Sequence, residues 1–207
     1  ANYSKEPEKS KVRDSLKQLM QKNYQLGIVI IPREYRDQLG TECIKALKQF
    51  IPANKEIQIP LDIYFDQGMF QSIAKTNAFI ESLNFDDCKF HLEQDSKIIK
   101  GIQLADLCAH ICAIQFKESL GLIAKKVKAG LNSGYEPDSE MELGFEMWAT
   151  LRYCFFRQTS KIAIDDPIED ATLEVEPFGL YVSDLCTDEL KRKIRETFGR
   201  VYLGCIH

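Results

Sequence analysis

Two carboxylates, Asp95 and Asp106, lie close together along a stretch of the chain that is otherwise largely apolar. Asp95 follows a short run typical of a β-strand, and Asp106 lies within an apolar run whose spacing predicts a helix. A carboxylate in an apolar helix costs free energy unless a charge or a hydrogen bond compensates it. A divalent cation would do so, because magnesium takes oxygen ligands and is commonly held by one or two carboxylates. The two residues therefore predict a metal site.

The expected orientation of Asp106 follows from helix geometry. At about 100° per residue, Asp106 lies on the same side of the helix as Ile99, Ile102 and Ala113. Small and apolar neighbours of this kind indicate the side that packs against a sheet, so we expect Asp106 to point inward. The alternative is a carboxylate that hydrogen-bonds to the backbone or caps a neighbouring element. Asp95 has an alternative role as the N-cap or turn residue of the same helix.

Asp66 adds a third carboxylate at the end of another predicted strand. In the run from Glu56 to Asp66, apolar residues alternate with Asp62, Tyr64 and Asp66, which share one face. In parallel α/β sheets, sites form beyond the carboxyl ends of the strands. Because Asp66 and Asp95 both occur at strand ends, we expect them to meet at one edge of the sheet. Asp62 lies deeper along the same face and is the weaker candidate.

Three further polar residues near these acids have open roles. Lys97 is either a solvated turn residue or a point charge that meets a phosphate. Gln103 lies about 60° from Asp106 around the helix, where it either orients a carboxylate or water or faces solvent. His91 shares a strand face with Asp95, and is either a ligand or, preferably, a strand histidine with a local hydrogen bond.

The seven cysteines are an odd number and occur among apolar neighbours. This pattern predicts reduced, buried thiols rather than a disulfide framework. The run Cys108-Ala109-His110-Ile111-Cys112 contains zinc-ligand residue types. On a helix, however, His110 projects away from the face shared by Cys108 and Cys112, so one metal cannot collect all three. We interpret the two cysteines as core thiols.

The elements that position the acids alternate between strands and helices. This alternation is typical of an α/β domain in which parallel strands are joined by crossover helices. After Gly121 the pattern weakens, so we expect an α/β core at residues 1–120 and a C-terminal α+β extension at residues 121–207. The predicted helices are 11–23, 33–50, 68–83, 98–119, 141–156 and 188–203, the predicted strands are 25–31, 56–66, 88–93 and 172–182, and a loop is expected over 130–139.

Composition narrows the classes of partner. The chain has 207 residues, with 27 basic against 31 acidic side chains and a net charge of −4, so it has no general attraction to nucleic acid. Basic residues cluster at 125–128 and 191–200, where we interpret them as solvated helix faces. No apolar run approaches the ~20 residues of a membrane span, and the chain does not start with a signal-peptide pattern. We therefore expect a cytoplasmic protein without a membrane partner.

The segment from Phe90 to Ala113 resembles the C-terminal motif of the family called domain of unknown function 3800 (DUF3800). The resemblance is most specific at Gln103-Leu104-Ala105-Asp106. The strand that ends Tyr64-Phe65-Asp66 is similar to an internal strand of that family. In all, the resemblance covers roughly residues 16–116.

The resemblance implies a ribonuclease-H-like mixed sheet flanked by helices. It also implies that Asp66, Asp95 and Asp106 bind Mg or Mn for hydrolysis of phosphodiester bonds in nucleic acid, with Lys97 and Gln103 assisting. Members of the family open with a strand bearing an Asp-Glu-Ser-Gly-like motif, whereas the Asp-Glu pair of this chain, Asp188-Glu189, starts a late predicted helix. Because this opening motif is missing, we expect that the chain either lacks its N-terminal portion, which its alanine start allows, or is a degenerate member.

Three functions follow from these observations. The leading hypothesis is a divalent-metal-dependent nuclease. The alternative is a non-catalytic α/β module that binds a protein partner through residues 121–207, which the missing first acid favours. A third possibility is an enzyme that uses the same acids on a small molecule.

Overall fold

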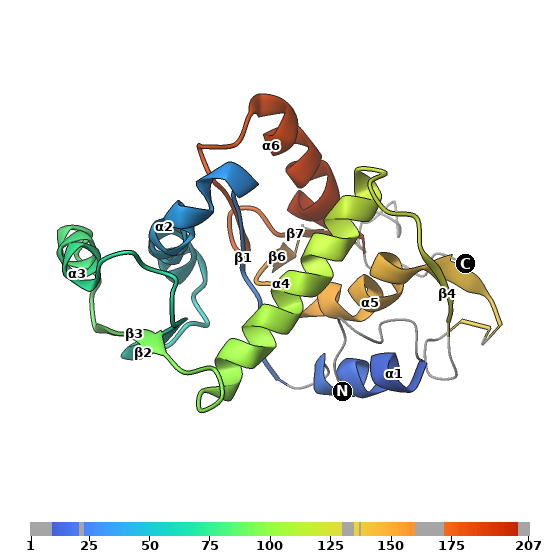
Figure 1. The fold of residues 1–207 in the computed structure, drawn as a ribbon, viewed down its shortest axis with the longest axis horizontal. Coiled ribbons are helices and arrows are strands. Elements are labelled where there is room, and N and C mark those ends of the chain that lie inside the picture. The colour runs from blue at the N-terminus through green and yellow to red at the C-terminus, as the bar shows by residue number, and fades with distance from the viewer. Residues whose placement is uncertain (1–9, 21–22, 130–134, 137, 160–171, 203–207) are drawn as a thin grey trace. The chain divides into compact units, whose positions relative to one another are not determined.

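The structure is a computed structural model that describes residues 10–20, 23–129, 135–136, 138–159 and 172–202 (Figure 1). Over these ranges the fold is mixed α/β. The chain divides into two compact units, each built from two separate segments. The first unit joins Ala1–Leu26 to Leu107–Phe155, and the second joins Gly27–Asp106 to Phe156–His207. This division differs from the predicted boundary at residue 120, which falls within the first unit.

Two pairs of parallel strands form the framework of the second unit. Strand β2 (Leu61–Asp66) pairs with β3 (Cys88–Gln94), as the predicted strand–helix–strand order requires. Strand β1 (Ile28–Ile30) pairs with β8 (Leu180–Val182) instead of joining β2 and β3. A strand from the expected C-terminal extension therefore completes a sheet of the expected core.

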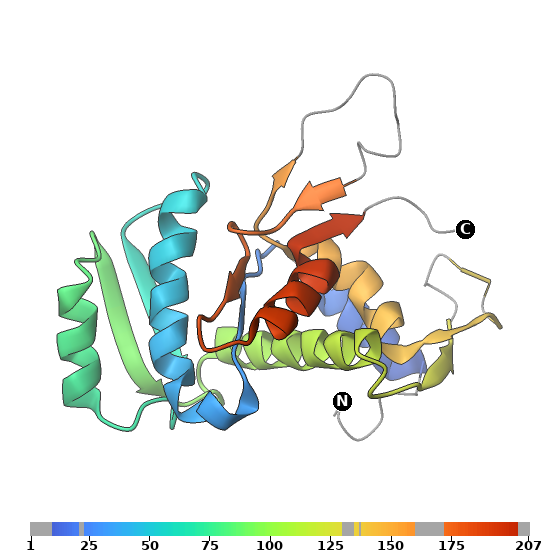
Figure 2. The same cartoon turned by 90° about the horizontal axis from the view of Figure 1, so that it is seen from above.

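Helices α2 (Leu39–Ala53) and α3 (Ile73–Ser82) follow β1 and β2 in the second unit. Figure 2 shows α2 beside the β2–β3 pair, where the Lys48 ammonium lies 5.1 Å from the Phe85 ring centroid. Helix α2 buries Ile44, Ala46 and Phe50. The α3 N-cap is Ser72, whose side chain accepts a hydrogen bond from the backbone of Lys75.

The C-terminal part of the second unit departs from two predicted elements. The single strand expected over 172–182 is two strands, β7 and β8, with a turn between them. The helix expected over 188–203 ends earlier and leads into a strand; Thr187 is its N-cap, as predicted. The described elements here are β6 (Gln158–Thr159), β7 (Thr172–Glu174), α6 (Asp188–Ile194), the π-helical turn η4 (Arg195–Gly199) and β9 (Arg200–Tyr202), with β6, β7 and β9 forming an antiparallel sheet.

The first unit is mainly helical. Its described core includes Met147, Trp148 and Phe155, and the buried ion pair of Lys17 with Glu146 ties α1 to α5. The Glu118 carboxylate accepts hydrogen bonds from the first turn of α5, at 2.8 Å from Gly144 N and 3.2 Å from Phe145 N. The elements are α1 (Ser10–Met20), α4 (Lys100–Ser119) from Leu107 onward, β4 (Lys126–Lys128), β5 (Glu140–Glu142), α5 (Leu143–Leu151) and the 3-10 turn η2 (Arg152–Cys154).

Most of the predicted loop over 130–139 lies outside the described residues. Among the helices that the structure describes, none combines the length and apolar character needed to cross a membrane.

Candidate functional site

Two of the three predicted acids, Asp66 and Asp95, lie at the same end of the β2–β3 pair. In the parallel register, Asp66 lies opposite Gln94, the residue immediately before Asp95. We call this end of the pair, with Asp66 and Asp95, the β2–β3 edge. The register shifts between Tyr64 and Asp66, and Glu93 opposite this shift has a φ of 55°.

Local hydrogen bonds fix the β2–β3 edge. Asp66 Oδ1 accepts a bond from the backbone N–H of Gln67 at 3.0 Å. Glu93 Oε2 accepts one from Gly68 N at 2.8 Å, which ties the loop after β2 to β3. Asp66 is half-buried and Glu93 is exposed. These contacts hold the backbone and leave Asp66 Oδ2 without a hydrogen bond to any described residue.

Asp95 starts the turn that leads into α4. Its Oδ1 accepts a hydrogen bond from Lys97 N at 2.8 Å, and its backbone carbonyl accepts bonds from the N–H groups of Ile98 and Ile99. This is an Asx-type turn, so the structural alternative considered for Asp95 is present. The turn uses one carboxylate oxygen, and Oδ2 has no hydrogen-bond partner in the described part of the chain.

The two polar residues expected to assist the acids also contribute to this turn. Gln103 Nε2 donates to the carbonyl of Ser96 at 2.7 Å, which anchors the turn to the first part of α4. The Lys97 side chain is exposed, and the backbone carbonyl of Lys97 accepts a hydrogen bond from Lys100 Nζ at 2.9 Å. Gln103 therefore positions the turn next to Asp95, and Lys97 is available to an incoming group.

The predicted inward orientation of Asp106 is wrong, because its side chain is exposed. Ala109 and His110 on its side of α4 are exposed too, although Ile102 on that side is buried, and Cys108 and Ile111 on the opposite side are 1% and 0% exposed. Because apolar residues lie on both sides of this helix, the pattern did not show that Asp106 faces solvent. Among the described residues, no group of three or more His, Cys, Asp or Glu side chains is arranged to hold a metal.

The described cysteines behave as core thiols. All six are free, and Cys108 and Cys112 are buried, as predicted. Burial raises the pKa of Cys108 to about 11. The thiol therefore stays protonated at neutral pH, which makes it a poor nucleophile and a poor metal ligand.

A histidine–carboxylate pair lies on the polar face of the β2–β3 pair. His91 Nε2 lies 2.6 Å from Asp62 Oδ1, and the His91 ring stacks on Tyr64 with 4.5 Å between ring centroids and 8° between ring planes. His91 is thus the hydrogen-bonded strand histidine preferred from the sequence. The side chains of His91 and Asp62 are 24% and 58% exposed, so solvent reaches the pair.

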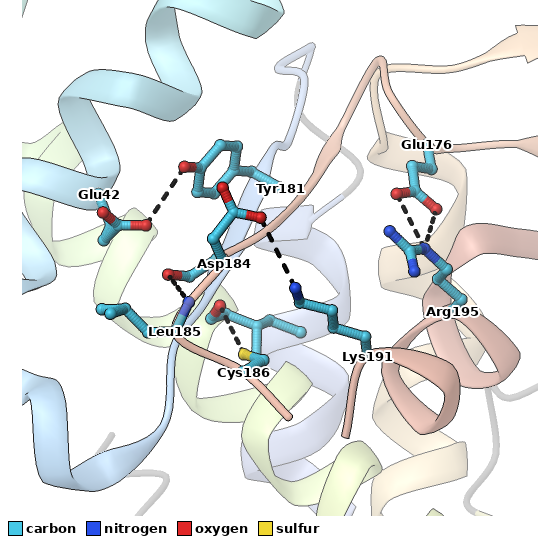
Figure 3. Close-up of polar contacts among 10 residues, drawn as sticks. Glu42, Glu176, Tyr181, Asp184, Leu185, Cys186, Lys191 and Arg195 are labelled. Atoms are coloured by element: carbon cyan, nitrogen blue, oxygen red, sulfur yellow. Dashed lines mark hydrogen bonds and ion pairs between the residues drawn. The ribbon is translucent and has the colours of Figure 1, made fainter. Parts of the chain in front are cut away.

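A second polar cluster, which sequence reasoning missed, lies where β1 and β8 end (Figure 3). Glu42 of α2 is 1% exposed. It accepts hydrogen bonds from Lys45 Nζ at 2.6 Å and from the Tyr181 hydroxyl at 3.2 Å. Burial acts to raise the pKa of Glu42, but hydrogen bonds from Lys45, Ser183 and Tyr181 outweigh it, and the pKa is lowered. We call these four residues the Glu42 cluster.

The segment after β8 encloses the Glu42 cluster. Ser183 is fully buried; its N–H donates to the Ile30 carbonyl at 3.1 Å, and its Oγ accepts from Leu185 N at 3.2 Å. Cys186 Sγ lies 3.7 Å from the same carbonyl (Figure 3). The Glu42 carboxylate is therefore buried and hydrogen-bonded by groups of its own chain, with the Lys45 side chain reaching it from the exposed surface. The Glu42–Lys45 spacing was its one local signal, because the other partners come from far along the chain.

The comparisons with known proteins add no relative. No family model, no curated protein and no solved structure matches this chain. The class that the structure itself defines is a mixed α/β protein, with two acids at the carboxyl edge of a parallel strand pair.

Proposed function

We propose that the chain is a divalent-metal-dependent nuclease-like domain whose ion site is the β2–β3 edge. The observation that carries this proposal is the parallel register, which puts Asp66 opposite the residue before Asp95. The ribonuclease-H-like arrangement and the DUF3800 kinship implied by the sequence resemblance are part of the same proposal. Asp106 is left out of the proposed ion-binding set because its side chain on α4 is exposed, whereas Asp66 and Asp95 are half-buried at the strand ends.

The donor set fits a hard divalent cation. Asp66 and Asp95 each use one carboxylate oxygen in a local hydrogen bond and keep the other for a ligand. Mg²⁺ or Mn²⁺ is commonly held by one or two carboxylates, with waters completing its coordination. When bound, such an ion polarises a phosphoryl oxygen and lowers the pKa of a bound water. Lys97, exposed in the turn after Asp95, would contact a phosphate of the substrate.

Metal binding is tested by the melting temperature during a Mn²⁺ titration. We expect Mn²⁺ to stabilise the chain, since a ligand that binds only the folded state raises its stability by mass action. Asp95→Asn and Asp66→Asn should reduce this response, because the amide keeps the local hydrogen bond and removes the charge. Asp86→Asn, at the amino end of β3, is the matched control and should respond like the wild type.

The reaction is tested on labelled single- and double-stranded DNA and RNA with Mg²⁺ or Mn²⁺. Cleavage that requires the metal and is lost in Asp66→Asn would support the proposal. A Mn²⁺ response without cleavage of any nucleic acid would favour an enzyme that uses the same acids on a small molecule. Equal melting temperatures with and without Mn²⁺ would contradict the metal site.

The second candidate function is a non-catalytic interaction module. Two observations favour it: Asp95 and Gln103 already have structural partners, and apolar side chains are exposed after residue 120. Leu122 is 69% exposed and Tyr153 is 48% exposed. A chain that neither binds Mn²⁺ nor cleaves nucleic acid would fit this module, with residues 121–207 as its partner-binding part.

A further inference from the structure

The His91–Asp62 pair has the geometry of an oriented imidazole. A carboxylate that accepts a hydrogen bond from one ring nitrogen fixes the tautomer, so that the other nitrogen becomes the acceptor. Here Asp62 Oδ1 lies 2.6 Å from His91 Nε2, so in the neutral ring a hydrogen bond to the carboxylate requires the proton on Nε2 and leaves Nδ1 as the acceptor. Stacking on Tyr64 at 4.5 Å restricts the ring further. Within the described residues, Nδ1 has no hydrogen-bond partner.

The pair also lies on the same face as the proposed ion site. His91 is opposite Tyr64 in the register, and Asp66 is two residues further along β2. At a rise of about 3.3 Å per residue, the Cα atoms of Tyr64 and Asp66 are about 7 Å apart along the strand. Alternation puts Asp62, Tyr64 and Asp66 on one face. A water bound at the β2–β3 edge would therefore lie on the same face as the imidazole.

We propose that His91 is the general base of the phosphodiesterase reaction, with Asp62 as its positioning residue. The inference rests on the proposed function and adds the proton acceptor to it. As a water oxygen bonds to phosphorus, Nδ1 takes one of the water protons, and the other proton stays on the new P–OH group. The bond from phosphorus to the leaving oxygen breaks, this oxygen takes a proton from solvent, and His91 returns its proton to solvent.

Both acidic and basic side chains surround His91. The His91–Asp62 pair remains accessible to solvent. An exposed ion pair contributes little to stability, so a purely structural role would leave little trace in unfolding experiments. The charged or titratable neighbours on this face are Asp62, Tyr64 and Asp66 on β2 and Lys89 and Glu93 on β3.

The tautomer is tested without any activity. The chain has three histidines, so nitrogen-15 NMR of the imidazole rings can be assigned with His91→Gln and His110→Gln. We expect the neutral form of His91 to carry its proton on Nε2 in the wild type, and a mixture of tautomers in Asp62→Ala. A His91 that carries its proton on Nδ1 would overturn the inference, whatever the protein does to nucleic acid.

The catalytic role is tested by the pH dependence of kcat on a labelled oligonucleotide that the wild type cleaves with Mn²⁺. We expect His91→Gln to lower kcat by about 100-fold or more, with KM little changed and the acidic limb of the profile removed. Asp62→Ala should cause a smaller loss, and His110→Gln none.

Two outcomes separate the hypotheses. Activity that Asp66→Asn abolishes, combined with a normal pH profile in His91→Gln, would overturn the general base and leave the proposed function intact. A wild type that cleaves neither DNA nor RNA would overturn both.

Discussion

In the second unit, carboxylates lie at the carboxyl ends of two parallel strand pairs, β2–β3 and β1–β8. The two groups of carboxylates differ in burial and in hydrogen bonding. At the end of β2 and β3, Asp66 and Asp95 are half-buried, and each has one carboxylate oxygen without a hydrogen bond to a described residue. At the end of β1 and β8, Glu42 is 1% exposed and accepts bonds from Lys45 and Tyr181. A carboxylate at the end of parallel strands is therefore not enough to define a site.

Hydrogen-bond saturation separates the two edges. A buried polar group must be paired, and Glu42 meets this requirement entirely with groups of its own chain. Its environment holds the carboxylate ionised, since its pKa is lowered. At the β2–β3 edge the described residues supply only part of the hydrogen bonds that the two carboxylates can accept. The first arrangement stabilises the fold, and the second is the arrangement that the proposed ion site requires.

The largest effect should come from removing the buried carboxylate. We expect Glu42→Ala to lower the free energy of unfolding by about 3 kcal/mol, because it leaves the Tyr181 and Ser183 hydroxyls and the Lys45 ammonium without their acceptor. Urea unfolding followed by circular dichroism measures this. Lys55→Ala, at an exposed position just after helix α2, is the control. A loss no greater than that of the control would show that the Glu42 cluster does not stabilise the fold.

Glu42→Gln removes the charge and keeps the shape of the side chain, so it should have a smaller effect than Glu42→Ala. We expect it to lower the free energy of unfolding by about 1–2 kcal/mol at neutral pH. Because the folded-state pKa is lowered, this contribution is complete above the ordinary pKa of a glutamate. It disappears as the pH falls through the folded-state value. Unfolding curves of wild type and Glu42→Gln should therefore converge in acid. A constant difference at every pH would mean that the carboxylate is not ionised in the folded state.

A still smaller effect is expected in the turn at Asp95. Asp95→Ala removes the hydrogen bond to Lys97 N, at 2.8 Å in the wild type, and should cost about 1 kcal/mol. Asp95→Asn keeps an acceptor oxygen and should cost much less. The comparison of the two variants by thermal unfolding without metal measures the turn separately from the charge. Equal losses in both would assign the effect to the charge and weaken the Asx-turn interpretation.

Local patterns predicted the elements around the β2–β3 edge. Strands β2 and β3 and helix α4 occur where alternation and helical spacing indicated them. The parallel orientation of β2 and β3 then follows from the crossover order, and their register puts Asp66 beside the residue before Asp95. These features depend on residues close together in the chain, which is why a single sequence contains them.

Contacts between residues far apart in the chain could not be predicted from the sequence. The pairing of β1 with β8 and the bond from Tyr181 to Glu42 join residues more than a hundred positions apart, and no local pattern encodes their register. The predicted inward orientation of Asp106 was wrong for a different reason. Helix α4 has apolar residues all round, so its periodicity did not distinguish the buried side from the exposed one.

The smallest effect on stability should come from the acid that matters most for the proposed site. Without metal, Asp66→Asn should change the free energy of unfolding by less than about 0.5 kcal/mol, because the half-buried side chain bonds only to the next residue's N–H, which an amide oxygen also accepts. The variant that leaves the fold intact should thus be the one that loses the Mn²⁺ response, whereas Glu42→Gln should lose stability and keep that response. Urea unfolding of both variants, with and without Mn²⁺, measures the contrast. If Asp66→Asn destabilised the metal-free chain as strongly as Glu42→Gln, the β2–β3 edge would be a second structural cluster, and its acids would need no ligand to explain them.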